Sequence, residues 1–268
     1  MRTNGPSIAR TTMFVEHNGL RLAYETAGSG NPAIVMVHGW ACNRSYFAPQ
    51  FDHFAAHRTV VSVDLRGHGD SDHPEPGPGV YDIDTLCDDV LAVAAAAGCE
   101  SPVVVGHSLG ALVALGCAAR GGAGAAIMVD PAPIVSERGK AFFGRAADAS
   151  EADADRSWRT RFVSGLFLPT DTVRREEIIS GMPQQPPAIA AALLRAIALF
   201  DGASALGAVA GPLLSIGAAV PSDIAADLRR ACPTMTIGQT VGAGHFNQLE
   251  VPDQVNVMID RFLSINGV

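Results

Sequence analysis

Residues 102–120 read PVVVGHSLGALVALGCAAR, and this stretch decides the fold. The apolar run at 102–105 predicts a buried strand, and residues 109–120 have the length and composition of a helix. Gly106-His107-Ser108-Leu109-Gly110 stands between them, a G-x-S-x-G pattern in a strand–turn–helix context. Glycine at both ends lets the backbone and the helix approach closely, so the turn projects the Ser108 hydroxyl over the sheet edge as a candidate nucleophile. The alternative is a glycine-rich turn whose serine caps the helix.

The alternation of strand and helix continues on both sides of this turn. Near-continuous apolar runs, typical of strands buried on both faces, occur at 33–37, 60–64, 126–130, 212–217 and 235–241. Helix-length segments occur at 46–56, 82–97, 221–231 and 252–263. Ahead of them, 13–17 and 20–25 flank Asn18-Gly19, a two-residue hairpin signal. The sequence therefore predicts an α/β protein with a mostly parallel, doubly wound, eight-stranded sheet that begins antiparallel.

The interval between Asp130 and Pro212 does not continue this alternation of strands and helices. It has no strand-like run, and its Ala-, Leu- and Arg-rich segments and the Pro-rich stretch at 182–187 predict about four helices. Roughly seventy residues are too many for a loop in a compact domain, so we interpret the interval as a helical cap inserted after the sixth strand. The predicted boundaries are 12–132 and 208–268 for the core and 133–207 for the cap.

Four motifs occur in a fixed order along the chain. They are Val37-His38-Gly39-Trp40, the segment Asp64-Leu65-Arg66-Gly67-His68-Gly69-Asp70-Ser71, the turn around Ser108, and Gly242-Ala243-Gly244-His245-Phe246. With this combination the sequence resembles the α/β-hydrolase superfamily over nearly its full length. The resemblance implies an α/β-hydrolase fold and a catalytic triad in the chain order serine, acid, histidine.

A serine hydroxyl is a poor nucleophile at neutral pH and needs a base, usually an imidazole. Among the eight histidines, His245 follows the last strand-like run and lies in a glycine-flanked loop before the final helix. It also completes the order of the superfamily, so we assign it as the base. His38, His68 and His107 belong to motif turns, where an imidazole usually serves as a structural hydrogen-bonding group.

The acid departs from the usual pattern of the superfamily. Most members place an Asp two or three residues after the glycine that ends the seventh strand, but here Gly217 is followed by Ala-Ala-Val. Asp130 ends the sixth strand instead, and the crossover from Ser108 brings it to the same sheet edge. This arrangement resembles that of haloalkane and fluoroacetate dehalogenases and of zearalenone-type lactone hydrolases. We therefore assign Asp130 as the acid, with Asp223, in the first turn of a predicted helix, as the alternative.

The oxyanion of a tetrahedral intermediate needs two N–H donors. The amide after the nucleophile, that of Leu109, is one of them. The resemblance implies the amide of Trp40 as the other, because relatives with His-Gly-aromatic at this place use the aromatic residue. The ring of Trp40 and, in the cap, Trp158 are candidate pocket residues.

The composition of the chain indicates which classes of partner are not expected to bind it. The 268 residues carry a formal net charge of -8 and no basic stripe interleaved with aromatic residues, so nucleic acid is not an expected partner. The longest apolar runs are about half of a bilayer span and no leader is recognised, so no membrane association and a cytoplasmic location are expected. Five scattered cysteines predict reduced thiols and no metal site. No cofactor is expected, and the oligomeric state is left open.

These residues predict a hydrolase that cleaves a carboxylic ester or lactone of a small, mainly uncharged substrate through a serine acyl-enzyme. Dehalogenases and epoxide hydrolases of the superfamily have Asp at the elbow, whereas Ser108 indicates acyl chemistry. A C–C bond hydrolase, an acyltransferase or a perhydrolase could use the same triad. A ligand-binding, receptor-like protein with little turnover is the alternative outside the enzymes.

Overall fold

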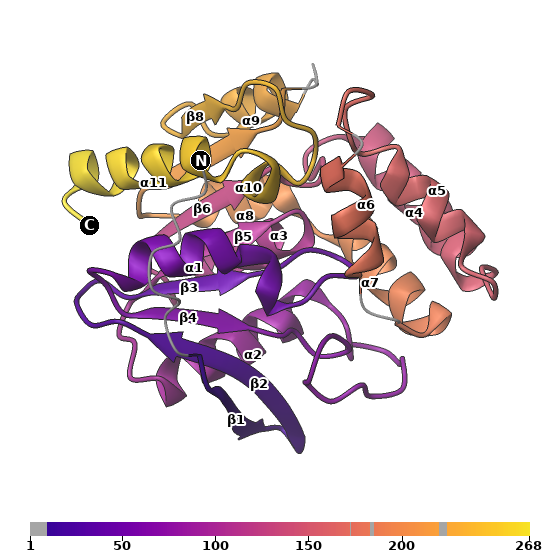
Figure 1. Cartoon of the computed structure of the whole chain (residues 1–268), viewed down its shortest axis with the longest axis horizontal. Helices are drawn as coiled ribbons and strands as arrows, with labels where there is room; N and C mark the ends of the chain where they lie inside the picture. Colours follow the sequence, from indigo (N-terminus) through magenta and orange to yellow (C-terminus); the bar gives the residue numbers. More distant parts are fainter. Residues whose placement is uncertain (1–9, 172, 183–184, 220–223) are drawn as a thin grey trace.

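The computed structural model describes residues 10–171, 173–182, 185–219 and 224–268, and Asp223, the alternative acid, lies outside them. The strands are β1 (Thr12–His17), β2 (Leu20–Ala27), β3 (Ile34–Val37), β4 (Val60–Val63), β5 (Val103–His107), β6 (Ala125–Val129), β7 (Leu213–Gly217) and β8 (Thr236–Gln239). They form one sheet in the order β1-β2-β4-β3-β5-β6-β7-β8 (Figure 1). The β1–β2 and β2–β4 pairings are antiparallel and all the others are parallel, which confirms the predicted sheet.

Helices cover both faces of the sheet because its inner strands are apolar on both sides. Outside the cap the helices are η1 (Arg44–Phe47), α1 (Ala48–Ala55), α2 (Ile83–Ala96), α3 (Leu109–Ala119), α8 (Gly202–Ala208), α9 (Ile224–Ala231), α10 (Asn247–Glu250) and α11 (Pro252–Asn266). In β3, Ile34 and Met36 belong to the core cluster with α1 and α11, whereas Val35 and Val37 belong to the one with α2 and α3. This split follows from the two-residue period of a strand.

The register of the parallel strands brings the motif residues to one edge of the sheet. Val37 is opposite Gly106 in β5, and His107 is opposite Val129 in β6. The residues that follow β3, β5, β6 and β7 therefore leave the sheet side by side. This is the carboxyl edge, where open α/β sheets bind their ligands.

The cap covers this edge with four helices, seen at the right of Figure 1: α4 (Glu137–Glu151), α5 (Ser157–Ser164), α6 (Val173–Ser180) and α7 (Pro187–Leu199). Helix α4 packs along α7, and α5 contacts both α4 and α6. Helix α8 packs against α3 of the core, and the predicted cap boundary at residue 207 falls inside it. The sequence predicted about four helices between Asp130 and Pro212, and the described residues of that interval form five, α4 to α8.

Helix α7 is the most apolar helix of the cap. Ile189, Leu193 and Ile197 are buried in the core cluster that α7 shares with α2 and α3. In the described ranges no single helix is long and apolar enough to cross a membrane, whereas α7 and α8 taken together pass that test but are bent by 62°.

Candidate active site

Ser108 lies in a sharp turn between β5 and α3, where the backbone is strained. Its φ of 53° and ψ of −113° are costly for any residue with a Cβ. A Cβ on Gly106 would lie 1.9 Å from the carbonyl oxygen of Gly110, and a Cβ on Gly110 would lie 2.1 Å from that of Val37. Both glycines are therefore required for the turn. The Ser108 side chain makes no capping hydrogen bond to α3 within the described chain, so it does not act as the helix cap.

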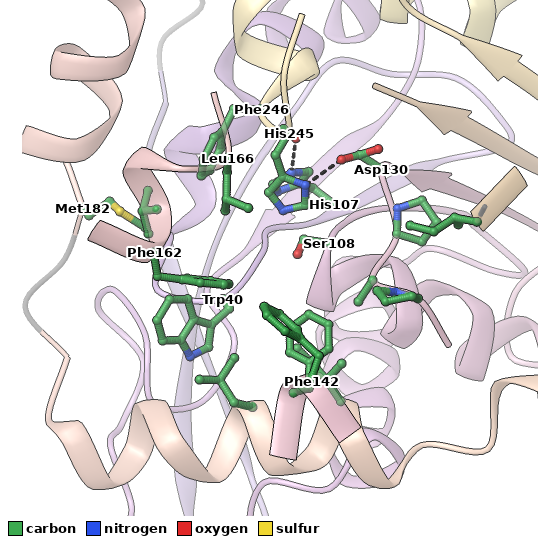
Figure 2. A pocket seen from close by; sticks show the side chains of 18 residues that line it. Trp40, His107, Ser108, Asp130, Phe142, Phe162, Leu166, Met182, His245 and Phe246 are labelled. Carbon is green, nitrogen blue, oxygen red and sulfur yellow. Dashed lines mark hydrogen bonds and ion pairs between the residues drawn. The ribbon is translucent and has the colours of Figure 1, made fainter. Parts of the chain in front are cut away.

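The structure brings Asp130 and His245 into direct contact, although they are far apart in the sequence. Asp130 directly follows β6 with a φ of 40°, and its Oδ2 lies 2.6 Å from Nδ1 of His245 (Figure 2). Its Oδ1 accepts a hydrogen bond from the amide of Ala218, at 2.8 Å. A carboxylate in this position keeps the proton on Nδ1 and leaves Nε2 of the imidazole available as a base.

Two further hydrogen bonds fix the backbone of His245. Its N–H donates to the carbonyl oxygen of Leu166, in the cap, at 2.9 Å. Its carbonyl oxygen accepts a hydrogen bond from Nε2 of His107, at 2.8 Å (Figure 2). Of the polar atoms of His245, Nε2 is then the one without a hydrogen-bond partner among the described residues. His245 and Ser108 line the same cavity.

His107 stays neutral beside the catalytic candidates. Burial, followed by the proximity of His245, holds the pKa of His107 well below its usual value. Because Nε2 donates to the His245 carbonyl, the lone pair of the neutral ring is on Nδ1, a buried atom with no partner in the described regions. The two ring centroids are 4.7 Å apart. His107 therefore adds no positive charge next to an imidazole that must accept a proton.

The amides of Trp40 and Leu109 are free to bind an oxyanion. Neither donates a hydrogen bond to any group in the described ranges. The loop after β3 lies against the elbow, since a Cβ on Gly39 would be 3.2 Å from Cβ of Ser108. Ala41, two residues on, has a φ of 55°. Strained backbone thus occurs at Ala41, Ser108 and Asp130, all at the same edge, as is common where a structure holds reacting groups in place.

A cavity of ≈ 210 Å³ lies between the elbow and the cap (Figure 2). Its core-side wall includes Trp40, Pro131, Ala132, Pro133, Ile224 and Phe246. Its cap-side wall includes Phe142, Phe143, Phe162, Val163, Leu166, Met182, Leu194 and Ile197. The titratable groups that the described structure places in the wall are Asp130, His245 and the neutral His107. Apart from these groups and the Ser108 hydroxyl, the side chains of the wall are apolar.

Trp158, predicted as a pocket residue, lies behind the cavity wall. Its ring stacks on that of Phe162, with centroids 5.1 Å apart and planes 8° apart, and meets Trp40 edge to face at 6.4 Å. Trp158 and Phe162 are four residues apart on α5, so they share one face of the helix. Phe162 is the one of the two that lines the cavity. Trp158 therefore supports the wall, whereas Trp40 is part of it.

Among the described residues, no arginine of the cap lines the cavity. Arg159 is buried, and burial lowers its pKa. Its Nη2 donates to the carbonyl oxygen of Gln185 at 2.9 Å, and its guanidinium carbon lies 5.5 Å from the Trp40 ring centroid. Arg195 pairs with Asp148 and Glu151 on the surface of α4. In the described regions, no three His, Cys, Asp or Glu side chains are arranged to hold a metal ion.

Phe142 and Glu250 are residues of the site that were not found from the sequence. Phe142 lines the cavity, but its spacing is that of an ordinary packing residue. Glu250 accepts hydrogen bonds from the amides on both sides of His245. An acidic residue within one turn after a loop could have suggested that contact, because such residues often reach back to free N–H groups at a helix start.

The sheet, the strained serine turn and the cap over the carboxyl edge are those of an α/β hydrolase. Residues 34–257 match the alpha/beta hydrolase family, and the chain belongs to that family. The AB hydrolase superfamily protein YisY of Bacillus subtilis is 38% identical over 100 residues, 37% of this chain and 36% of that protein. Epoxide hydrolase 3 of Mus musculus is 38% identical over 101 residues, 37% of this chain and 27% of that protein. The matched part of the chain spans about a third of the length of these curated relatives.

Solved structures are similar over nearly the whole chain. The enol-lactonase of Burkholderia xenovorans has a TM-score of 0.80 and 22% identity, with 94% of this chain and 100% of that one covered. A thermophilic esterase of Thermogutta terrifontis has a TM-score of 0.80 and 23% identity, with 97% and 100% covered. At this level of identity the likeness shows a shared fold. The neighbours include esterases, lactonases and epoxide hydrolases, so they define a superfamily of hydrolases and leave the substrate open.

Proposed function

We propose that this protein is a serine hydrolase that cleaves a carboxylic ester or a lactone of a small, uncharged substrate. The observation that carries the proposal is the hydrogen bond between Asp130 and Nδ1 of His245 beside the strained Ser108, at the wall of one apolar cavity. We refer to Ser108, His245 and Asp130 as the triad.

The reaction follows from the position of each group. Ser108 Oγ attacks the substrate carbonyl carbon while its proton passes to Nε2 of His245. The amides of Trp40 and Leu109 stabilise the oxyanion. When the C–O bond to the alcohol breaks, the imidazolium returns the proton to the leaving oxygen and an acyl-enzyme remains. Water then attacks the acyl carbon, His245 takes the water proton and returns it to Ser108, and the carboxylic acid leaves.

Serine at the elbow favours acyl substrates over epoxides. Attack of Ser108 on an epoxide carbon would form an ether, and ethers are not hydrolysed by a base-activated water. Attack on an ester or lactone forms an ester, which the second half of the cycle hydrolyses. The relationship to epoxide hydrolases therefore does not carry their reaction to this chain.

The cavity wall supports a small and mainly apolar substrate. Its volume of ≈ 210 Å³ is below the range of about 300–1,000 Å³ that is usual for pockets of drug-sized ligands. The wall groups other than the triad and His107 are apolar side chains, which cannot neutralise a charged substituent. Phe142, Phe162 and Trp40 give this wall flat aromatic surfaces.

A fluorophosphonate probe, which phosphonylates activated serines, tests the proposal without knowledge of the natural substrate. We expect stoichiometric labelling of Ser108 in the wild type and none in Ser108→Ala. The labelled protein should also lose the ability to cleave a panel of p-nitrophenyl esters and small lactones. An intact Ser108 that resists the probe, in a protein that turns over no member of the panel, would instead support the ligand-binding alternative.

A further inference from the structure

Glu250 connects the two amides that flank His245. Its Oε2 accepts the N–H of Gly244 at 2.9 Å, and its Oε1 accepts the N–H of Phe246 at 3.0 Å. One carboxylate thus spans the residue that carries the imidazole. Both distances are ordinary for N–H···O hydrogen bonds, and together the two bonds restrain the backbone on both sides of His245.

We propose that Glu250 is a positioning residue for His245, and the proposal rests on the serine hydrolase function proposed above. Asp130, Leu166 and His107 hold His245 itself, through Nδ1, the amide and the carbonyl. Glu250 completes this set by fixing the peptide units before and after it. The direction of Nε2 is then set by groups from four separate parts of the chain.

The ordinary explanation for such a contact is helix capping. Glu250 ends α10, a single turn of four residues, and Phe246 is the residue that precedes it. A capping role would account for the bond to the Phe246 amide. It does not account for the bond to Gly244, which lies outside the helix and before the histidine. The second bond is the reason to assign a role in placing the imidazole.

The surroundings of Glu250 are costly for a carboxylate. Burial raises its pKa, the two amide donors oppose this rise, and the nearby Asp171 carboxyl of the cap raises the pKa further. No Lys or Arg forms an ion pair with Glu250 in the described ranges. The two hydrogen bonds from the amides beside His245 offset part of this cost.

The same loop provides a matched control. Gln254 also makes two hydrogen bonds to a loop residue. Its Oε1 accepts the N–H of Val241 at 2.8 Å, and its Nε2 donates to the Val241 carbonyl at 3.0 Å. Val241 is in the loop between β8 and α10 but does not flank His245. Gln254→Ala therefore removes a comparable pair of loop bonds without touching the residues beside the imidazole.

The experiment compares Glu250→Gln, Glu250→Asp and Gln254→Ala with the wild type. Gln keeps the shape of Glu but presents an N–H₂ group to one of the two amides, and Asp is one methylene shorter and cannot span both. We expect fluorophosphonate labelling of Ser108 to slow by about ten- to a hundred-fold in Glu250→Gln, because small displacements of a reacting group have effects of this size. Glu250→Asp should be intermediate, and Gln254→Ala should label like the wild type.

Two accompanying measurements separate positioning from stability. On any ester that the panel identifies, kcat should fall in Glu250→Gln while KM stays within about twofold, because the apolar wall is unchanged. The melting temperature of Glu250→Gln should stay close to that of the wild type, because the loss of one hydrogen bond is offset by removal of a carboxyl group whose charged form is disfavoured by burial.

Labelling of Glu250→Gln and Glu250→Asp at the wild-type rate would overturn this proposal and leave the serine hydrolase function standing. Slowing of Glu250→Gln and Gln254→Ala in parallel with their melting temperatures would also overturn it, since Glu250 would then be a general support of the loop. A wild type that the probe does not label would overturn the serine hydrolase function and this proposal together.

Discussion

The elbow and the histidine loop place their reactive side chains by different means. At the elbow, residues 106–110 hold Ser108 at a φ of 53°, because Gly106 packs against Gly110, Gly110 packs against the Val37 carbonyl, and neither has room for a Cβ. In the histidine loop, residues 240–246, the restraints come from elsewhere. His107, Asp130 and Leu166 each contribute one contact, from β5, the end of β6 and the cap, and Glu250 contributes two, from α10.

This difference teaches where each region is vulnerable. The elbow depends on the close steric fit of its two glycines, one of them against the end of β3, so damage there should appear as loss of folding. The histidine loop depends on hydrogen bonds from distant elements, so damage there should appear as loss of rate in a folded protein. The cap supplies one of the restraints on the histidine loop, because the Leu166 carbonyl accepts a hydrogen bond from the amide of His245.

Removal of the acid should give the largest effect. Asp130→Asn keeps the size of the side chain but favours the wrong tautomer of His245, so kcat should fall by up to about ten-thousand-fold. The melting temperature should change little by comparison. Asp223→Asn is the control, and steady-state ester hydrolysis is the measurement. A larger loss in Asp223→Asn than in Asp130→Asn would show that the acid has been misassigned.

A methyl group at the elbow should act on stability. In Gly110→Ala the new Cβ would lie 2.1 Å from the Val37 carbonyl oxygen and 2.5 Å from that of His38, and backbone cannot move away cheaply. We expect a loss of about 3 kcal/mol in the free energy of unfolding, measured with urea. Gly144→Ala, in α4 with nothing within 4 Å, should instead be neutral or stabilise its helix. Equal stabilities of the two variants would contradict the steric account.

His107 belongs to both regions, and its substitution sharpens the comparison. His107→Phe keeps a ring at the elbow but leaves the His245 carbonyl without its donor, so kcat should fall by about tenfold. His107→Gln can place an N–H near the same carbonyl and should retain most of the activity. If the Gln variant were as slow as the Phe variant, the hydrogen bond would not be the cause.

The smallest expected effect is a dependence of stability on pH at Glu250. Its pKa is raised in the folded protein, mainly by burial, so folding favours the protonated form. The stabilisation is present below the ordinary pKa of Glu, about 4.3, and is lost as the pH rises through the raised pKa. Glu250→Gln does not titrate there. The melting temperature of Glu250→Gln relative to that of the wild type should therefore increase between acidic and neutral pH. A decrease would show that the pKa of Glu250 is lowered on folding and not raised.

The sequence predicted those features that local patterns encode. The apolar runs and glycine-bounded turns predicted each strand, and G-x-S-x-G predicted the elbow. Asp130 was chosen over Asp223 from chain topology, and the structure places it against His245. The start of the predicted helix at 221–231 lies outside the described residues.

The cavity wall was less accessible to sequence reasoning. Trp158 and Phe162 lie four residues apart on the same face of α5. The structure shows that Phe162 lines the cavity and that Trp158 packs behind it, and their spacing in the sequence does not distinguish the two roles. Leu166 acts through its backbone carbonyl, which no side-chain pattern reports. Contacts of this kind depend on how the cap packs on the core, and a single sequence does not specify that packing.

The most direct test of the account asks whether Asp130 acts through His245. Rates of fluorophosphonate labelling of Ser108 would be compared in Asp130→Asn, His245→Ala and the double variant. If the pair works as one unit, the double variant is no slower than His245→Ala alone, because Asp130 has no other route to the serine. If the two losses multiply, Asp130 and His245 act independently, and the triad as described here does not exist.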